Sequence, residues 1–442
     1  MSALALVARR RGVAVSGCDS DPAGASDVAL LGAQILTGHD PAHVAGARAV
    51  VVTAAVPADH PELAQARALG VPVVPRKQAL ADLVNPGRVV ALAGTHGKST
   101  TTVMTTEALT AAGLEPTGLA GGRVTEWGGN AWLGSDRLFV VEADEYDQAF
   151  LTLRPAVAVV NNVEADHLEC YGSVAALEDA FVRFAGPAER AIIGADDPGA
   201  RRVAERLGGS AARRQGKVWT FGFEDADLAL SEVQQSAEGS RATVTLPEHG
   251  RVTLRLGVPG VHNLRNATGA LGAVLALGAP IEPALAALAR YRGLGRRFEW
   301  LGEAGGIGFV DDYAHHPSEL VATLAAARQA FPGRRIVAVF QPHLFSRTAE
   351  HGEAMGRALA AADVAIVTEI YAAREQPLPG VTGRCVATAA ERAGGKVLFE
   401  ADKTRLRERI LAVARAGDVV ITLGAGDVTR VGRELVQWLR AA

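Results

Sequence analysis

The sequence has few cysteines and no long apolar run, so it lacks the features that form disulfide frameworks, zinc ribbons and membrane spans. Cysteine occurs only at positions 18, 170 and 385 of 442 residues, without a CxxC pair, and aromatic residues make up 5%. This usage argues against a disulfide scaffold or a structural zinc motif and indicates a reducing compartment. The sequence lacks an apolar run of about eighteen residues and a signal-like N-terminus, so we expect a cytoplasmic protein without a membrane partner.

The chain also lacks an excess of charge of either sign. It has 45 basic and 48 acidic residues, for a net charge of -3, so neither a nucleic acid nor an anionic membrane is an expected partner. Hydrophobic residues make up 48% and charged residues 21%, which is typical of a globular protein. The length predicts two or three domains.

The most informative segment is GTHGKSTTT at residues 94–102. It follows an apolar run at residues 88–93 and begins a helix-like stretch, the order of a strand, a phosphate loop and a helix. Glycines let backbone N–H groups turn toward an anion, Lys98 adds a positive charge and Ser99 offers a hydroxyl to Mg²⁺. We predict that a nucleoside triphosphate binds here, although the spacing departs from the strict Walker pattern and an ordinary strand-helix turn is the alternative. The predicted contacts are Gly94, Thr95, His96, Gly97, Lys98, Ser99 and Thr100.

Proline and glycine divide the chain into three α/β blocks. Residues 1–86 form a Rossmann-like block, with a helix expected at 2–11 and a strand at 13–16. Residues 87–296 form a P-loop-type ATPase block with a mostly parallel sheet, to which alternating segments within 217–256 add antiparallel strands. Residues 297–442, after a glycine-rich hinge, form a second Rossmann-like α/β block.

Polar residues follow two further predicted strands of the central block. Glu142 begins the acidic run EADEYD after the strand at 138–141, and His167 follows the strand at 156–160. Because strand ends of α/β sheets carry active groups, we expect both residues near Lys98, with one or more carboxylates holding Mg²⁺. The alternative is a solvated acidic turn and a buried histidine.

Two loops of the third block, at residues 311–317 and 341–348, each follow a predicted strand and belong to one sheet edge. The adjacent residues His315 and His316 diverge, with no cysteine or third histidine nearby in sequence, so we favour substrate or nucleotide contact over zinc. Arg297 lies at the hinge, where it either binds a phosphate or is a solvent-exposed side chain of the linker.

Nine ordered blocks together resemble the Mur ligase family of ATP-dependent amide-bond synthetases over nearly the whole chain. The blocks are residues 94–102, 142–147, 164–167, 262–266, 295–298, 311–317, 341–348, 370–375 and 424–427. The block at 341–348 is most similar to the alanine-adding group of the family.

The resemblance implies roles for individual residues. Lys98 would contact the ATP phosphates, while Mg²⁺ would be held by Ser99, Glu142 and His167. The adenine contacts would be His262 and Asn266, the γ-phosphate clamp Arg297, a nucleotide contact Asp312, and the amino-acid contacts Tyr313, His316 and Arg347. The implied catalytic residues are Lys98, Glu142, His167, Arg297, His316 and Arg347.

The implied reaction joins L-alanine to the lactyl carboxylate of UDP-N-acetylmuramate in cytoplasmic peptidoglycan precursor synthesis. ATP would convert the carboxylate to an acyl phosphate, which the amine attacks. Residues 1–86 would bind the UDP-sugar through Asp19, Asn130 would face the sugar, and residues 297–442 would bind the amino acid and close on the nucleotide. We expect a monomer or a weak homodimer.

Two departures from the family accompany the resemblance. The first strand and glycine loop of the UDP-binding domain do not precede Met1, so we expect that the N-terminus is truncated or its start assigned too late. Leu344 stands where many members carry arginine, which gives Arg347 a larger expected role.

Three other functions remain open from the sequence. A murein peptide ligase would act on the same nucleotide sugar, and an inactive relative would bind ATP as a regulator. A dinucleotide dehydrogenase would fit the Rossmann-like start, but the sequence lacks GxGxxG and Lys98 would be unexplained.

Overall fold

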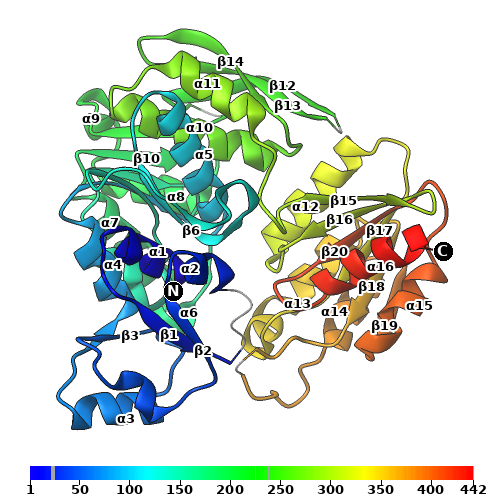
Figure 1. Cartoon of the computed structure of the whole chain (residues 1–442). Coiled ribbons are helices and arrows are strands. Elements are labelled where there is room, and N and C mark those ends of the chain that lie inside the picture. The colour runs from blue at the N-terminus through cyan, green and yellow to red at the C-terminus, as the bar shows by residue number, and fades with distance from the viewer. Residues whose placement is uncertain (21–24, 224, 237, 374, 442) are drawn as a thin grey trace. The chain divides into compact units, whose positions relative to one another are not determined.

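The computed structural model describes residues 1–20, 25–223, 225–236, 238–373 and 375–441 (Figure 1). Contacts divide the chain into two compact units. The first comprises Met1–Glu232, Ala242–Leu254 and Arg265–Arg290, and the second comprises Val233–Arg241, Arg255–Leu264 and Tyr291–Ala442.

The N-terminal part of the first unit contains two small parallel sheets. One sheet pairs β1 (Ser16–Asp19) with β2 (Gln34–Thr37), and the other pairs β3 (Val50–Val52) with β4 (Val73–Pro75). The helices here are α1 (Ser2–Arg10), α2 (Ser26–Leu30), η2 (Pro41–Val44), α3 (Pro61–Ala68) and α4 (Arg76–Val84).

The strand expected at residues 13–16 was wrong in its position, because β1 spans Ser16–Asp19 and residues 13–15 lead to it from the cap of α1. Gly12 adopts a φ of 76°, and the Val13 N–H donates to the Ala8 carbonyl at 3.0 Å. This pattern ends a helix through a left-handed glycine, so β1 begins only at Ser16.

A ten-stranded sheet lies at the centre of the chain, in the order β14-β13-β12-β11-β10-β9-β5-β8-β6-β7. Its strands are β5 (Arg88–Ala93), β6 (Thr117–Val124), β7 (Gly129–Trp132), β8 (Leu138–Glu142), β9 (Val157–Val160), β10 (Arg190–Gly194), β11 (Val218–Gly222), β12 (Leu228–Ser236), β13 (Gly239–Leu246) and β14 (Gly250–Leu256). Because β5 runs parallel to both β8 and β9, the segments that follow these three strands leave the same edge of the sheet.

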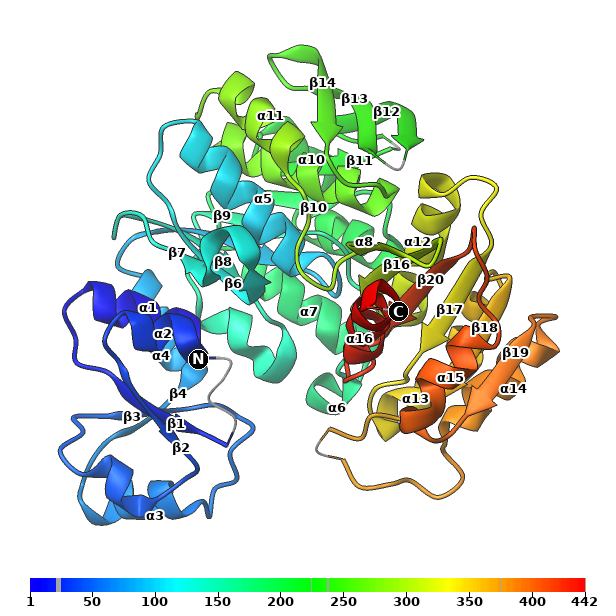
Figure 2. The same ribbon diagram turned by 45° about the vertical axis from the view of Figure 1, so that its right-hand side comes forward.

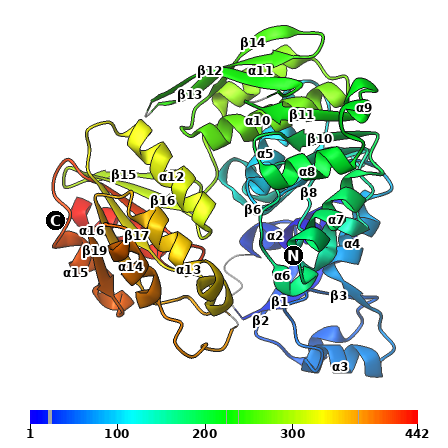
Figure 3. The ribbon, with the colours of Figure 1, turned by 180° about the vertical axis from the view of Figure 1, so that it is seen from behind.

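Helices cover both faces of this sheet. Figure 2 shows α5, α10 and α11 on one face, where Gly272 of α10 approaches Ile192 closely. Figure 3 shows α7 and α8 on the other, where Phe181 and Val203 join a core with Ala91. The helices of this region are α5 (Lys98–Ala111), η3 (Thr125–Trp127), η4 (Tyr146–Thr152), α6 (Leu168–Tyr171), α7 (Val174–Ala185), α8 (Pro198–Arg206), α9 (Gly209–Arg214), α10 (Val261–Ala276) and α11 (Ile281–Arg290).

The second unit is built on a six-stranded sheet in the order β15-β16-β20-β17-β18-β19. Only β15 is antiparallel to its neighbour among these described strands. The strands are β15 (Glu299–Ala304), β16 (Ile307–Asp312), β17 (Ile336–Phe340), β18 (Val364–Thr368), β19 (Val397–Glu400) and β20 (Val419–Leu423).

Two separate apolar cores cover the faces of the six-stranded sheet. One face packs against α12 (Pro317–Ala330), α13 (Phe345–Leu359) and α14 (Gly383–Arg392). The other packs against α15 (Leu406–Leu411), which follows η5 (Lys403–Arg405), and α16 (Thr429–Ala441). The predicted α/β class with mostly parallel sheets is confirmed. Among the described helices, none is long and apolar enough to cross a bilayer.

Candidate active site

The phosphate loop connects β5 to α5 through two glycines in conformations that side chains rarely adopt. Gly94 has a φ of 135°, and Gly97, the residue that caps α5, has a φ of 80°. A Cβ atom on Gly97 would lie 2.5 Å from the Asn266 Oδ1 atom and 3.0 Å from the Asn161 Nδ2 atom. Only glycine fits here, and the first backbone N–H groups of α5 are left at the helix end, where they favour an anion.

The loop is fixed to the segment after β9 by hydrogen bonds. The His96 N–H donates to Asn162 Oδ1 at 2.7 Å, and the Glu164 N–H donates to Thr95 Oγ1 at 2.9 Å. The Asn161 amide donates to Thr101 Oγ1 at 2.9 Å. These contacts connect the loop and the start of α5 to the segment that follows β9. Sequence reasoning did not single out Asn161 or Asn162.

Lys98 forms a buried ion pair with Glu145. Its Nζ atom lies 2.7 Å and 2.9 Å from the two carboxylate oxygens and donates to the Gly94 carbonyl at 2.8 Å. Burial alone would lower the pKa of Lys98, but the carboxylates of Glu145, Asp144 and Glu142 outweigh it and raise that pKa. Lys98 therefore carries its positive charge where the phosphate loop meets α5. Sequence reasoning did not single out Glu145, because four carboxylates in one short run gave no basis for choosing among them.

Glu142 lies at the end of β8, and a neighbouring strand positions it. The Gly121 N–H of β6 donates to Glu142 Oε2 at 2.5 Å. A Cβ atom on Gly121 would lie 2.6 Å from Glu142 Oε1, so the carboxylate occupies the space that a side chain would fill. The Ser99 hydroxyl and the Glu142 carboxylate are oxygen donors of the kind that Mg²⁺ prefers, so the residues present fit this ion. No sequence pattern pointed to Gly121.

His167 also follows a strand of the same sheet edge. It precedes α6 with a φ of 54°, and its ring lies 5.1 Å from the ring of Tyr146. Its nitrogens lie 3.4 Å from a carboxylate oxygen of Glu169 and 3.8 Å from one of Asp166. The structure thus joins His167 to the acidic segment at 142–147 through the Tyr146 ring.

The two predicted adenine contacts both lie near the start of α10. Asn266 is buried and packs against Gly97, so the structure brings it to the phosphate loop. His262 is half-buried in the first turn, beside Gly260. An adenine contact for either residue stays a prediction.

The predicted sugar-side residues lie on two different sheets. Asp19 is exposed at the carboxyl end of β1, and Asn130 is half-buried on β7. The Asn130 Oδ1 atom is buried and has no hydrogen-bond partner among the described residues. Buried polar atoms usually have a partner, so this oxygen is suited to accept a hydrogen bond from a ligand.

Two guanidinium groups lie over the ring of Tyr313 in the second unit. Its ring centre is 4.7 Å from Arg296 Cζ and 4.9 Å from Arg297 Cζ. Arg297 is also 3.5 Å from a Glu319 carboxylate oxygen, while Arg296 donates to the Gly424 carbonyl at 2.7 Å. Both hinge arginines therefore have partners at the carboxyl edge of the second sheet.

Asp312 is buried at the end of β16, and both of its oxygens are engaged. They accept hydrogen bonds from the Phe298 N–H and the Ala314 N–H, each at 2.7 Å. Burial raises the pKa of Asp312 to about 6, although Arg297 and these hydrogen bonds oppose the change. The observed contacts connect the hinge to the strand, and the nucleotide contact stays a prediction.

The remaining predicted residues lie on the helices that follow β16 and β17. His316 is buried, with Nδ1 2.7 Å from Ser318 Oγ. Arg347 is buried in the first turn of α13. Burial lowers the pKa of His315 and of His343 to about 4, and the nearby charge of Arg347 adds to both shifts. These residues converge at one end of the sheet, as the sequence predicted.

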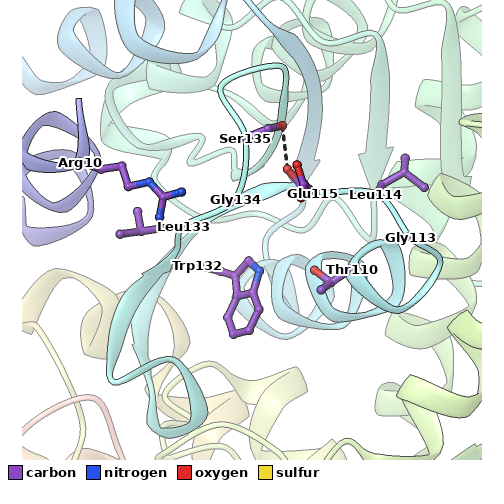
Figure 4. A pocket seen from close by; sticks show the side chains of 9 residues that line it. All are labelled: Arg10, Thr110, Gly113, Leu114, Glu115, Trp132, Leu133, Gly134 and Ser135. Carbon is purple, nitrogen blue, oxygen red and sulfur yellow. Dashed lines mark hydrogen bonds between the residues drawn. The ribbon is translucent and has the colours of Figure 1, made fainter.

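A separate surface pocket lies on the first unit (Figure 4). It is lined by Arg10, Thr110, Gly113, Leu114, Glu115, Trp132, Leu133, Gly134 and Ser135. The Ser135 hydroxyl donates to the Glu115 carbonyl at 2.8 Å. The lining includes none of the predicted site residues, so we do not assign the reaction to this pocket.

Comparisons with known proteins match one family over nearly the whole chain. The description "Mur ligase family, catalytic domain" matches residues 1–88, "Mur ligase middle domain" matches 92–274, and "Mur ligase, glutamate ligase domain" matches 296–426. The UDP-N-acetylmuramate–L-alanine ligase of Mycolicibacterium vanbaalenii is 45% identical, covering 100% of this chain and 94% of the relative. That of Streptomyces griseus is 43% identical, with coverages of 99% and 95%.

Solved structures give the same result. The crystal structure of UDP-N-acetylmuramate-alanine ligase from Thermotoga maritima has a TM-score of 0.85 at 28% identity, covering 100% of this chain and 96% of that one. A murein peptide ligase from Psychrobacter arcticus has a TM-score of 0.70 at 24% identity, with coverages of 99% and 96%, and shows the fold alone. With three matching domain descriptions and full-length relatives, the chain belongs to the Mur ligase family.

Proposed function

We propose that this protein is a ligase that uses ATP to join L-alanine to UDP-N-acetylmuramate. The observation that carries the proposal is full-length similarity, at 45% and 43% identity, to relatives named for that reaction. The reaction would belong to peptidoglycan precursor synthesis in the cytoplasm, and we expect the protein to work as a monomer or weak homodimer.

The phosphate loop of the first unit would bind the ATP phosphates. Gly94 and Gly97 leave room for the anion, and Lys98 is held in its charged form. Glu145 keeps the ammonium in place until a phosphate oxygen competes for it. Ser99, Glu142 and His167 would hold Mg²⁺, which when bound supplies further positive charge for the phosphate oxygens.

The chemistry needs positioning and charge neutralisation rather than a nucleophilic side chain. The lactyl carboxylate oxygen attacks the γ-phosphorus, an O–P bond forms, and the bond to ADP breaks. The amine of L-alanine then attacks the acyl carbon, a C–N bond forms, inorganic phosphate leaves and the nitrogen loses a proton. Exclusion of water protects the acyl phosphate between these steps.

Residues on both units would select the two other substrates. The buried Asn130 oxygen would accept a hydrogen bond from the sugar, and Asp19 would contact the uridine side. In the second unit, Arg347 would pair with the carboxylate of L-alanine, with Tyr313 and His316 beside it, and Arg297 would contact the γ-phosphate. His262, Asn266 and Asp312 would complete the nucleotide contacts.

The experiment that tests the proposal is phosphate release from ATP by the purified chain. Each common amino acid, and separately a murein tripeptide, is added with UDP-N-acetylmuramate, and Lys98→Met serves as the inactive control. Release that requires both L-alanine and the sugar supports the proposal. Release with the tripeptide alone would identify a murein peptide ligase, and ATP binding without release would identify a regulatory relative.

A further inference from the structure

Three metal-ligating side chains meet in the N-terminal part of the first unit, away from the phosphate loop in sequence. Cys18 comes from β1, His39 from the loop after β2, and Glu62 from the first turn of α3. The Cys18 Sγ atom lies 3.3 Å from His39 Nδ1 and 3.3 Å from Glu62 Oε2. The His39 Nδ1 and Glu62 Oε2 atoms are 3.6 Å apart.

These separations are close to the spacing of ligands around one tetrahedral ion. Zinc bonds of about 2.3 Å to sulfur and about 2.0–2.2 Å to nitrogen and oxygen place the sulfur about 3.5–3.7 Å from each of the other two ligand atoms, and those two about 3.3–3.5 Å apart. The three observed distances differ from these values by about 0.3 Å or less. A point close to the triangle is therefore within bonding distance of all three donor atoms without rearrangement of the backbone.

Further contacts orient the Glu62 carboxylate. Its other oxygen, Glu62 Oε1, lies 2.9 Å from His43 Nδ1 and accepts a hydrogen bond from the Asp40 N–H at 3.1 Å. The rings of His39 and His60 pack edge to face with centres 5.0 Å apart. Partners of this kind fix the orientation of metal ligands in proteins.

We propose that Cys18, His39 and Glu62 form a binding site for a divalent transition-metal ion, with Zn²⁺ as the expected occupant. A thiolate, an imidazole and a carboxylate together favour Zn²⁺ or Co²⁺ over Mg²⁺, which prefers oxygen ligands. The thiol proton leaves to solvent when the ion binds. Three protein ligands leave the fourth coordination position of a tetrahedral ion open. The His39 side chain is 42% exposed, so water or a ligand can reach that position.

The competing explanation is a metal-free cluster in which the Cys18 thiol donates to Glu62. The two explanations differ in what the sulfur does when metal is added. The full chain is treated with a chelator, freed of it, and titrated with Co²⁺ while the near-ultraviolet and visible spectra are recorded. We expect one Co²⁺ per chain, with a sulfur-to-cobalt charge-transfer band and the intense visible bands of a tetrahedral ion.

Matched variants assign the band to this site. Cys18→Ser keeps a hydroxyl donor for Glu62 and is expected to lose the charge-transfer band, whereas Cys170→Ser and Cys385→Ser retain it. The His43→Ala variant retains the band but binds Zn²⁺ about 10- to 100-fold more weakly, measured by competition with a chromophoric chelator. Thermal unfolding checks that each variant is folded, and Zn²⁺ should raise the melting temperature of the unaltered chain but not of Cys18→Ser.

Two outcomes would overturn the proposal. One is the lack of any sulfur band in the folded, unaltered chain. The other is a Cys18→Ser variant that binds Zn²⁺ as tightly as the unaltered chain, which would leave Cys18 as a hydrogen-bond donor only.

Discussion

The Lys98 ammonium and the Glu145 carboxylate are joined through both carboxylate oxygens, at 2.7 Å and 2.9 Å. Glu145 is nearly fully buried, so the pair lies in a region where an unmatched charge is costly. The lysine that the sequence assigns to phosphate binding is thus held by an internal anion that a bound phosphate must replace or share.

The Glu145→Gln variant tests this ion pair. It leaves the Lys98 charge without its buried partner, so we expect the free energy of unfolding to fall by about 1–3 kcal/mol. Urea denaturation measures the loss, and Asp144→Asn, which alters an exposed carboxylate, is the matched control with a smaller effect. Equal stabilities of Glu145→Gln and the unaltered chain would show that the pair contributes nothing.

The contact between Gly121 and Glu142 predicts a substitution that lowers the affinity for Mg²⁺. In Gly121→Ala the new methyl group would meet Glu142 Oε1 at 2.6 Å, so the carboxylate must move. We expect the Mg²⁺ concentration for half-maximal phosphate release to rise about tenfold, equivalent to about 1.4 kcal/mol. Gly122→Ala is the control, because a Cβ atom there meets nothing within 4 Å. The same shift in both variants would remove Glu142 from the proposed metal site.

Loss of the Asn162 side chain is expected to change the KM for ATP selectively. Asn162→Ala removes the acceptor for the His96 N–H, which loosens the loop, and we expect the KM for ATP to rise roughly tenfold. The KM for UDP-N-acetylmuramate should change little, since the loop would contact only the nucleotide. Steady-state kinetics with each substrate varied in turn makes the comparison, and a rise in both KM values would indicate general unfolding.

The lowered pKa of His315 predicts a loss of stability in acid. Burial lowers this pKa from 6.5 to about 4. Between those values the unfolded chain binds a proton that the folded chain does not, so stability is present above about pH 6.5 and falls as the pH approaches 4. Each pKa unit corresponds to about 1.4 kcal/mol, so the contribution is about 3 kcal/mol at most.

The His315→Asn variant isolates this contribution. Its side-chain amide can replace Nδ1 as the donor to the Tyr313 carbonyl but takes up no proton in this range. The free energy of unfolding of the variant should therefore depend less on pH between about 4 and 6.5 than that of the unaltered chain. Parallel pH profiles of the two proteins would contradict the assignment.

The sequence predicted the parts of the site that adjacent residues build. The strand, glycine loop and helix around Lys98 could be predicted from the spacing of adjacent residues. The placement of Glu142 and His167 could be predicted because the carboxyl ends of parallel strands carry the active groups of α/β sheets. The partners Glu145, Gly121 and Asn162 could not be chosen, because their roles depend on strand order and on which side chain fills a small space. The strand expected at residues 13–16 begins only at Ser16, because Gly12 caps α1 and the Val13 N–H still donates to the helix.

The Cys18 cluster shows the same limit. Its three ligands are separated by 21 and 23 residues and share no spacing motif, so only the fold, which places Glu62 of α3 beside Cys18 and His39, brings them together. The lack of CxxC pairs in the sequence therefore does not exclude such a site.

The measurement that tests the central claim most directly follows one oxygen atom. UDP-N-acetylmuramate labelled with ¹⁸O in its lactyl carboxylate is incubated with ATP, Mg²⁺, L-alanine and the purified chain, and the released phosphate is analysed by mass spectrometry. Ligation through an acyl phosphate predicts one ¹⁸O atom in each phosphate, and release that depends on L-alanine. Phosphate without ¹⁸O would show that water, rather than the carboxylate, attacks ATP, and would contradict the proposed ligase reaction.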